Sequence, residues 1–424
     1  MQLAFLLYKY FPYGGMQRDF QRFVEECQAR GHSCRIYYIS WQGDAIPDTD
    51  LRHVPVRART HHSRNEKYYD WVQADLARDP VDGVVGFNKM PGLDVYYAAD
   101  SCYLEKALTE RGKWYRKGGR FRHFAAYEKA VFDPSSRTEI LLISETEKAK
   151  FVKHYATPES RMHMLPPGIS RDRCAGDDAQ QRRRTARESL DVEYGEHVLL
   201  FVGSGFIKKG LDRAIRALAN ARETQPHHAM RLLVVGQDKE RRFKRLAKKL
   251  GVDSQVHFLG GRDDVPELLL AADALVHPAL DEAAGIVLLE ALVAGLPVIC
   301  TDVCGYAHHI AAAKAGMVLR SPFQQEDLDH AILRTLDGFY RGQCRETGLV
   351  YAELTDLYSM HSTGAEIIEQ AVSAALGDTT SATRILRRVL SPALVASVVG
   401  PMFGRLTRNH TTAVTQATFD AALE

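Results

Sequence analysis

Two carboxylates stand eight residues apart around a predicted helix start. Glu282 precedes the small-residue loop 283–285, and Glu290 lies just past the first turn of a helix predicted for 286–294. A glycine-containing loop that leads into a helix offers free backbone N–H groups and the positive end of the helix dipole, which suit a phosphate. With an acid on each side, such a loop can hold a nucleotide sugar: one acid meets the sugar hydroxyls and the other the ribose diol.

Short apolar strands predicted at 274–277 and 298–301 flank this segment, and Gly295 and Pro297 end its helix. Acids near a helix start are commonly caps or partners of the helix dipole, so the E-x7-E spacing alone favours a structural role. The complete strand-loop-helix-strand context is what favours a ligand site.

Cations that can neutralise a diphosphate follow other predicted strands. Lys208 and Lys209 come after a glycine-rich turn that ends the strand 197–203. Such lysines can bind phosphate charge, although a lysine pair is equally often a solvated surface. Arg262 follows another strand, and Arg173 follows the rigid Pro-Pro-Gly break at 166–168, from where it can reach a cleft between domains.

Two shorter motifs carry less information. Gly14-Gly15 after the first strand lets the backbone approach a ligand closely, but it is no G-x-G-x-x-G dinucleotide fingerprint. Asp48-Thr49-Asp50 has the form of the D-x-D metal motif of some sugar transferases. It lies in a proline-containing loop beside no predicted strand end, so we interpret it as a coincidence. No His, Asp or Glu cluster stands out, and we expect chemistry without a metal.

The segment 103–132 carries eight Lys and Arg residues against three Glu, interleaved with aromatic residues. Basic residues among interfacial aromatics are typical of proteins that bind the anionic surface of a membrane. Nucleic acid is the rival partner for the same features, and a merely solvated helix is the third interpretation. We favour the membrane over nucleic acid, with the contact made by Lys113, Arg116, Lys117 and Arg120.

Strands and helices alternate along the chain, which predicts an α/β fold with parallel sheets. The pattern runs through the first half, is interrupted by a polar, Arg-rich linker at 170–195, and then restarts. Two consecutive doubly wound units imply two Rossmann-like domains that face a central cleft. A helix predicted at 351–375 crosses back to the first domain.

The 424 residues include seven scattered cysteines without a C-x-x-C pair, which suits a reducing compartment. The first residues lack a secretory layout, and no apolar run is long enough to span a bilayer. The formal charge is only +2, so the protein as a whole is not a polyelectrolyte binder. We therefore expect a cytoplasmic protein that is peripheral on the inner face of the membrane.

Together these motifs resemble the family-4 retaining glycosyltransferases of the GT-B fold, and within them the enzymes that glucosylate the lipopolysaccharide core. The resemblance runs from Met1 to about Ala375, through LYKYFPYGGMQRDF, VVGFNKMPGLDVYYAAD, LPPGI, VVGQDK, HPALDEAAGIVLLEA and VCGYAHHIA. It implies a metal-free transfer of glucose from UDP-glucose to the inner-core heptose of a lipid A core acceptor, with retention at the anomeric carbon. The leaving phosphate would take the acceptor proton in a front-face displacement.

The resemblance also implies roles for single residues. Glu282, Asp19 and Asp100 would face the reacting centre, although many relatives carry a His near the Asp100 position. The donor would be bound by a further set, namely Gly15, Arg173, Lys208, Lys209, Arg262, Ala284, Gly285, Ile286, Val287 and Glu290.

The expected domains are an acceptor-binding domain at 1–168, a nucleotide-sugar domain at 169–350, the crossing helix at 351–376 and a tail of open role at 377–424. Two other classes of function stay open: a GT-B enzyme with another UDP-sugar or acceptor, including an epimerase, and a nonenzymatic binding protein of the membrane surface.

Overall fold

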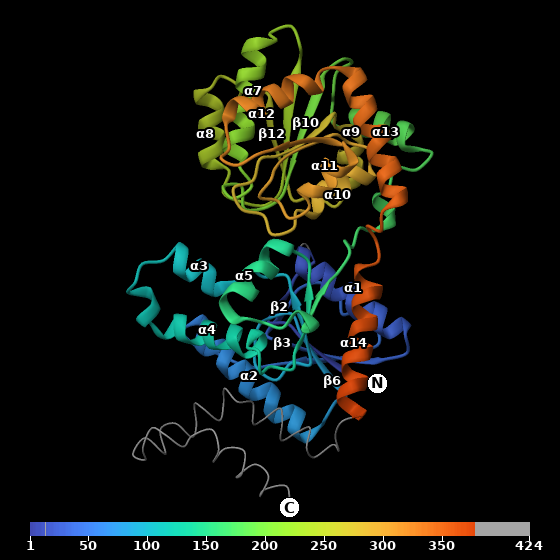
Figure 1. Cartoon of the computed structure of the whole chain (residues 1–424). Helices are drawn as coiled ribbons and strands as arrows, with labels where there is room; N and C mark the ends of the chain where they lie inside the picture. Colours follow the sequence, from blue (N-terminus) through green and yellow to red (C-terminus); the bar gives the residue numbers. More distant parts are fainter. Residues whose placement is uncertain (13, 378–424) are drawn as a thin grey trace, which may run out of the picture.

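The computed structural model describes residues 1–12 and 14–377, so the tail predicted at 377–424 lies outside the described residues except for Gly377. The chain forms two α/β lobes, one above the other in Figure 1, and the last described helix returns to the lobe that contains the N-terminus. Each lobe is built around its own parallel sheet, which bears out the predicted pair of doubly wound units.

The N-terminal lobe contains a seven-stranded parallel sheet in the order β5-β3-β1-β6-β7-β8-β9, plus the small parallel pair β2-β4. Its strands are β1 Gln2–Leu6, β2 Lys9–Tyr10, β3 Ser33–Tyr38, β4 Ser40–Trp41, β5 Thr49–His53, β6 Gly83–Gly86, β7 Val95–Ala98, β8 Glu139–Leu142 and β9 Met162–Met164. Its helices are α1 Gly15–Ala29, α2 His61–Arg78, α3 Tyr103–Thr109, α4 Gly119–Phe132, α5 Glu145–Tyr155 and α14 Met360–Gly377, with the 3₁₀ turns η1 Tyr115–Lys117 and η2 Glu159–Arg161.

The C-terminal lobe contains a six-stranded parallel sheet in the order β12-β11-β10-β13-β14-β15. Its strands are β10 His197–Val202, β11 Met230–Val235, β12 Val256–Gly260, β13 Ala274–His277, β14 Val298–Thr301 and β15 Gly316–Leu319. The turn η3 Arg171–Arg173 leads into its helices, α6 Ala179–Ser189, α7 Leu211–Thr224, α8 Arg241–Lys249, α9 Val265–Ala271, α10 Ile286–Val293, α11 Ala307–Ala313, α12 Gln325–Thr335 and α13 Gly338–Leu354.

Apolar side chains on both faces of each sheet explain why the strands read as nearly continuous hydrophobic runs. In β10, Leu199 packs into one core and Leu200 into the core on the opposite face. In β1, Phe5 and Leu6 divide in the same way between the two cores of the N-terminal lobe. Sheets that are covered by helices on both faces need this pattern.

The helix predicted at 351–375 is two helices, so this prediction is wrong in its extent. α13 ends at Leu354, and α14 begins at Met360. Asp356 is the reason, because its carboxylate accepts hydrogen bonds from the backbone N–H groups of Tyr358 and Ser359 at 3.0 and 3.1 Å. An Asp side chain that satisfies these groups competes with the helix and favours a turn.

α14 completes the core of the N-terminal lobe beside α1. A Cβ atom added to Gly364 would lie 2.3 Å from the ring of Phe23, and one added to Gly83 would lie 2.3 Å from Val372. Both glycines are therefore places where the returning helix and its neighbours approach more closely than a larger residue permits.

The motif Asp48-Thr49-Asp50 lies at the start of a strand, not in a loop away from the sheet as predicted. β5 begins at Thr49, and the Asp50 carboxylate accepts hydrogen bonds from Arg35 Nε at 2.9 Å and Arg52 Nε at 3.0 Å. β5 and β15 were both missed in the sequence. β5, with the sequence TDLRH, lacks the apolar alternation of a half-buried strand.

The two lobes meet through loops and helices that follow the carboxyl ends of their strands. Arg18 of α1 reaches Glu290 of α10 at 4.0 Å, and Lys106 of α3 reaches Asp281 in the loop after β13 at 3.4 Å.

Among the described residues, no helix has both the length and the apolar character needed to cross a membrane.

Candidate functional site

The order of strands in the C-terminal lobe fixes where a ligand is expected. β10 lies between β11 and β13, so the loops after β10 and after β13 leave the sheet in opposite directions. Ligands of such folds bind at this switch point, outside the carboxyl ends of the strands. Lys208 and Lys209 lie in the first loop and Glu282 lies in the second.

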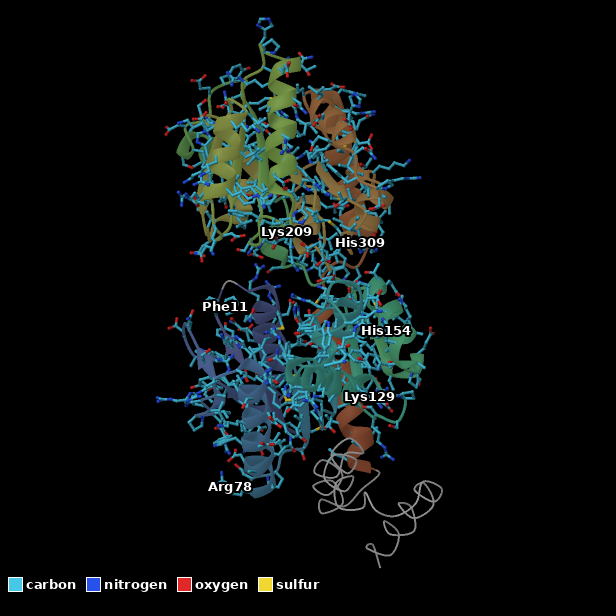
Figure 2. The ribbon with its side chains drawn as sticks, turned by 90° about the vertical axis from the view of Figure 1, so that its left-hand side faces the viewer. Phe11, Arg78, Lys129, His154, Lys209 and His309 are labelled. Atoms are coloured by element: carbon cyan, nitrogen blue, oxygen red, sulfur yellow. The ribbon has the colours of Figure 1, made fainter. Side chains whose placement is uncertain are left out.

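Lys209 and Glu282 form an ion pair across the switch point, and both side chains are largely buried. His277, the last residue of β13, brings its Nε2 to 3.2 Å from Glu282 Oε2. Burial lowers the pKa of Lys209, and the nearby carboxylate of Asp281 acts in the opposite direction. Figure 2 shows Lys209 on the surface of its lobe that is turned toward Phe11 of the other lobe.

Lys208 occupies a different environment from its neighbour. Its side chain is 66% exposed, and its Nζ lies 3.4 Å from Asp281 Oδ2. Lys106 of the N-terminal lobe lies at the same distance from the same oxygen. Although partial burial works against it, Lys106 and Lys208 hold the pKa of Asp281 below its usual range.

The loop before α10 has the geometry that the sequence predicts. Gly285 has a φ of +83° and forms the N-terminal boundary of the helix, a conformation that favours glycine. The segment between β14 and α11 holds the backbone of this loop. Gly305 N donates to Glu282 O at 3.2 Å, and Tyr306 N donates to Ala284 O at 2.8 Å. No side chain of the described residues caps α10, so its first turn, with Ile286 and Val287, offers N–H groups to an anion.

Glu290 is nearly buried in α10, and two arginines approach it. Arg173 Nε from η3 lies 4.0 Å from Glu290 Oε1, and Arg18 Nη1 of α1 lies at the same distance from the same atom. The second carboxylate of the E-x7-E motif is therefore placed where the two lobes meet. Its partner Arg173 is on the connection between the lobes, as the sequence predicts.

Two carboxylates of the N-terminal lobe were predicted to face the reacting centre. Asp19 lies in α1, one turn after Gly15. Its carboxylate accepts hydrogen bonds from Tyr97 at 2.8 Å and from His361 of α14 at 3.1 Å. Its charge contributes to the raised pKa of Tyr306 in the other lobe, after the larger effect of burial. Asp100 follows β7 and is exposed.

Arg262, the remaining predicted donor-binding cation, lies in the loop after β12 and already has a partner. Its guanidinium donates to both oxygens of Asp264, at 2.7 and 2.5 Å.

Within residues 1–12 and 14–377, no group of three or more His, Cys, Asp or Glu side chains is arranged as metal ligands.

Known proteins share both the sequence and the fold. The family model for glycosyl transferases group 1 matches residues 182–346. The lipopolysaccharide glucosyltransferase WaaG of Escherichia coli (strain K12) is 50% identical over 369 residues, which cover 87% of this chain and 98% of the relative. The chain belongs to the lipopolysaccharide glucosyltransferase family.

Solved structures agree with this family assignment. The crystal structure of WaaG, a glycosyltransferase involved in lipopolysaccharide biosynthesis, matches with a TM-score of 0.82 over 86% of this chain and 99% of that chain. Anabaena Alr3699/HepE in complex with UDP and glucose matches with a TM-score of 0.66 at 16% identity, covering 87% of this chain and all of that chain, and so shares the fold. The protein is a glycosyltransferase with the GT-B fold.

Four residues at this glycosyltransferase site were not identified from the sequence: Arg18, Lys106, His277 and Asp281. His277 and Asp281 stand within five positions of Glu282, so their closeness along the chain was a usable signal. Arg18 and Lys106 contact residues more than 170 positions away, and only the assembly of the two lobes brings them to the site.

The basic segment 103–132 forms α3, η1 and α4 at the side of the N-terminal lobe. Trp114 is 82% exposed, and Lys117 Nζ lies 4.5 Å from the centre of its ring. Lys113, Lys117 and Arg120 are exposed, while Arg116 is half-buried and donates to Leu108 O at 3.0 Å. The segment therefore presents cations next to an exposed aromatic side chain.

Proposed function

We propose that this glycosyltransferase moves glucose from UDP-glucose to the inner-core heptose of a lipid A core acceptor, with retention at the anomeric carbon and without a metal. The observation that supports it most is the Lys209–Glu282 pair at the switch point, directly before a helix start that lacks a side-chain cap. The printed function of the WaaG relative supports the choice of glucose and of lipopolysaccharide.

In this proposal the donor diphosphate binds Lys209 and Lys208 together with the N–H groups of the first turn of α10. The N–H groups are fixed before the reaction, and together with the two lysines they stabilise the negative charge that develops on the leaving diphosphate. Glu290, between Arg18 and Arg173, binds the ribose, and Glu282 binds the hydroxyls of the glucose. The lysines supply the positive charge that a metal supplies in other transferases.

The proposed transfer is a front-face displacement. The bond between the anomeric carbon and the diphosphate oxygen breaks, the bond to the acceptor oxygen forms on the same face, and the leaving phosphate oxygen takes the acceptor proton. Asp19 and Asp100 face the acceptor side, where a carboxylate stabilises positive charge on the sugar ring. Retention then needs no covalent intermediate on the protein.

Turnover of a panel of UDP-sugars with a heptose-terminated lipid acceptor, with and without EDTA, tests the proposal. We expect UDP-glucose to be preferred, EDTA to have no effect, and Glu282→Gln to lower kcat by about 100-fold, since preorganised polar groups at a reacting centre have effects of this order. Glu267→Gln, which changes an ion pair with Arg182 inside the C-terminal lobe, is the matched control.

Several results would contradict the proposal. Full activity of Glu282→Gln would remove Glu282 from the reaction, and a requirement for a divalent cation would contradict the metal-free mechanism. A glucosyl adduct trapped on Glu282 or Asp100 would replace the front-face path by a double displacement. Epimerisation of the UDP-sugar without acceptor would indicate another GT-B reaction.

We further propose that the enzyme works in the cytoplasm at the inner face of the membrane, with the segment 103–132 docked on anionic lipids. The support is its excess of cations, the exposed ring of Trp114 and the lipid nature of the proposed acceptor. Docking would bring the acceptor side of the enzyme to the surface that holds its substrate.

A further inference from the structure

His277 is a buried residue beside Glu282, the proposed sugar-binding carboxylate. The proposed reaction gives it no role. His277 is 1% exposed at the end of β13, pairs in register with Cys300 of β14, and its ring lies 6.3 Å from that of Phe201 at an interplanar angle of 23°. Burial in the closely packed end of the sheet restricts the rotation of the imidazole.

The two ring nitrogens of His277 have different surroundings. Nε2 lies 3.2 Å from Glu282 Oε2, whereas Nδ1 is buried and has no hydrogen-bond partner among the described residues. A proton on Nδ1 would be a buried donor without an acceptor, which is costly. The neutral ring therefore carries its proton on Nε2 and donates it to Glu282.

The charge state of the ring agrees with this assignment. Burial, assisted by the positive charge of Lys209, lowers the pKa of His277 to about 3, so the ring is neutral near pH 7. Glu282 thus has two partners of different kind: the mobile, charged Lys209 and the fixed, uncharged His277.

The difference between these two partners of Glu282 matters when a donor binds. Lys209 has a flexible stem, and a diphosphate competes with Glu282 for its charge. If Lys209 turns to the diphosphate, Glu282 loses its cation, while its backbone stays held by the hydrogen bond from Gly305 N. His277 cannot follow the ligand, because it belongs to the sheet.

We propose that His277 is a positioning residue, which keeps the Glu282 carboxylate aimed at the donor sugar when Lys209 transfers to the diphosphate. This inference rests on the proposed function, in which Glu282 binds the sugar hydroxyls. In this inference His277 acts through Glu282 and not by contact with the donor or the acceptor.

The test compares variants that keep or remove the donated hydrogen bond. His277→Phe keeps the ring and its packing but removes the N–H, and we expect its kcat to fall by about 10- to 100-fold, the loss that follows from removing a hydrogen bond to a charged group. His277→Gln can place an amide N–H near the same position and should recover most of the turnover. His197→Gln, a buried histidine at the opposite end of the sheet, controls for general loss of packing.

A double-mutant cycle separates positioning from a structural role. If His277 acts through Glu282, adding His277→Phe to Glu282→Gln should change kcat by less than about twofold, because coupled residues are not additive. A purely structural role would give the full loss in both backgrounds, and this result would overturn the inference, as would wild-type kcat for His277→Phe.

The same experiment distinguishes the two proposals. If Glu282→Gln keeps full turnover, the proposed function of Glu282 fails and the inference fails with it. If Glu282→Gln is inactive but His277→Phe is not, only the inference fails. Should His277→Phe not fold, as judged by circular dichroism, His277→Leu replaces it in the cycle with the same expected outcomes.

Discussion

At the scale of single residues, three histidines of the C-terminal lobe share an environment that excludes their charged form. Burial lowers the pKa of His197 to about 4, that of His277 to about 3 and that of His309 to about 4. Since an unfolded histidine has a pKa near 6.5, the unfolded chain binds protons that the folded lobe rejects. Burial of these histidines, including His277 at the site, therefore lowers the stability of the lobe in acid.

We predict that the free energy of unfolding falls as the pH decreases from about 6.5 toward 4. The folded pKa values lie below the unfolded value, so their contribution is fully present above pH 6.5 and is lost as the pH falls toward the folded pKa. For one fully buried histidine the loss between pH 7 and pH 5 is about 2 kcal/mol. Urea unfolding of the wild type and of His197→Gln at both pH values measures it.

The control for this prediction is His330→Gln, because His330 is an exposed histidine of the same lobe. Carboxylates also titrate at low pH, so the informative quantity is the difference between variants. An equal loss of stability in the wild type and in His197→Gln would contradict the prediction.

At the scale of elements, one buried carboxylate holds the basic segment in place. Glu128 of α4 is fully buried, accepts hydrogen bonds from the backbone N–H groups of Tyr103 and Leu104 at 2.7 and 2.9 Å, and pairs with Lys89 at 2.5 Å. The carboxylate thus caps the start of α3 from within α4. With this acid buried, only Glu105 and Glu110 remain to offset the cations of the segment.

We predict that replacing Lys113, Arg116, Lys117 and Arg120 with Ser weakens binding to vesicles that contain anionic lipid by about 100-fold or more. Each basic residue near such a surface contributes on the order of 1 kcal/mol, and the attraction falls as salt is added. Cosedimentation with vesicles at two salt concentrations measures the effect.

A matched set of exposed basic residues on the other lobe is the control for vesicle binding. Replacing Arg241, Arg242, Lys244 and Lys248 of α8 with Ser removes the same number of charges. Retained binding of this control together with loss in the first variant supports docking through 103–132. An equal loss in both would assign the effect to net charge, and no loss in the first would contradict docking.

At the scale of the whole molecule, partly exposed ion pairs join the two lobes. Arg18 and Lys106 of the N-terminal lobe meet Glu290 and Asp281 of the C-terminal lobe, and the side chains of both cations are at least one-third exposed. Such pairs contribute at most about 1 kcal/mol each, so they bias the relative position of the lobes without locking it. Motion between domains is the general expectation for contacts of this kind.

We predict that Arg18→Gln combined with Lys106→Gln leaves each lobe folded but broadens the range of distances between the lobes. Small-angle X-ray scattering should give a larger radius of gyration for the variant than for the wild type, and high salt should produce the same change in the wild type. Arg182→Gln with Lys244→Gln, which removes ion pairs inside one lobe, is the control. Identical scattering of all three proteins would contradict the prediction.

The sequence predicted the segment around Glu282 and Glu290 to within a residue, because Gly285, Gly295 and Pro297 mark its boundaries. It failed where the local signal pointed the wrong way: the polar strand β5, the short strand β15 and the Asp356 turn that divides α13 from α14. The predicted roles of the site residues stay predictions until variants are measured.

Contacts between distant parts of the chain could not be predicted. The pattern of residues along the sequence cannot predict that Arg18 reaches Glu290. That contact depends on how two independently formed sheets are placed relative to each other. The unprotonated Nδ1 of His277 is equally invisible in a sequence, because it follows from what surrounds the ring in three dimensions.

The return of α14 to the first lobe has a consequence for biosynthesis. Phe23, Leu3 and Gly83 are among the first residues to leave the ribosome, yet Gly364 and Val372, which cover them, are made several hundred residues later. The nascent N-terminal half must therefore wait with an uncovered apolar surface while the second lobe is translated and folds. Such a chain needs protection from aggregation during its synthesis, and the last helix acts as the closing step of maturation.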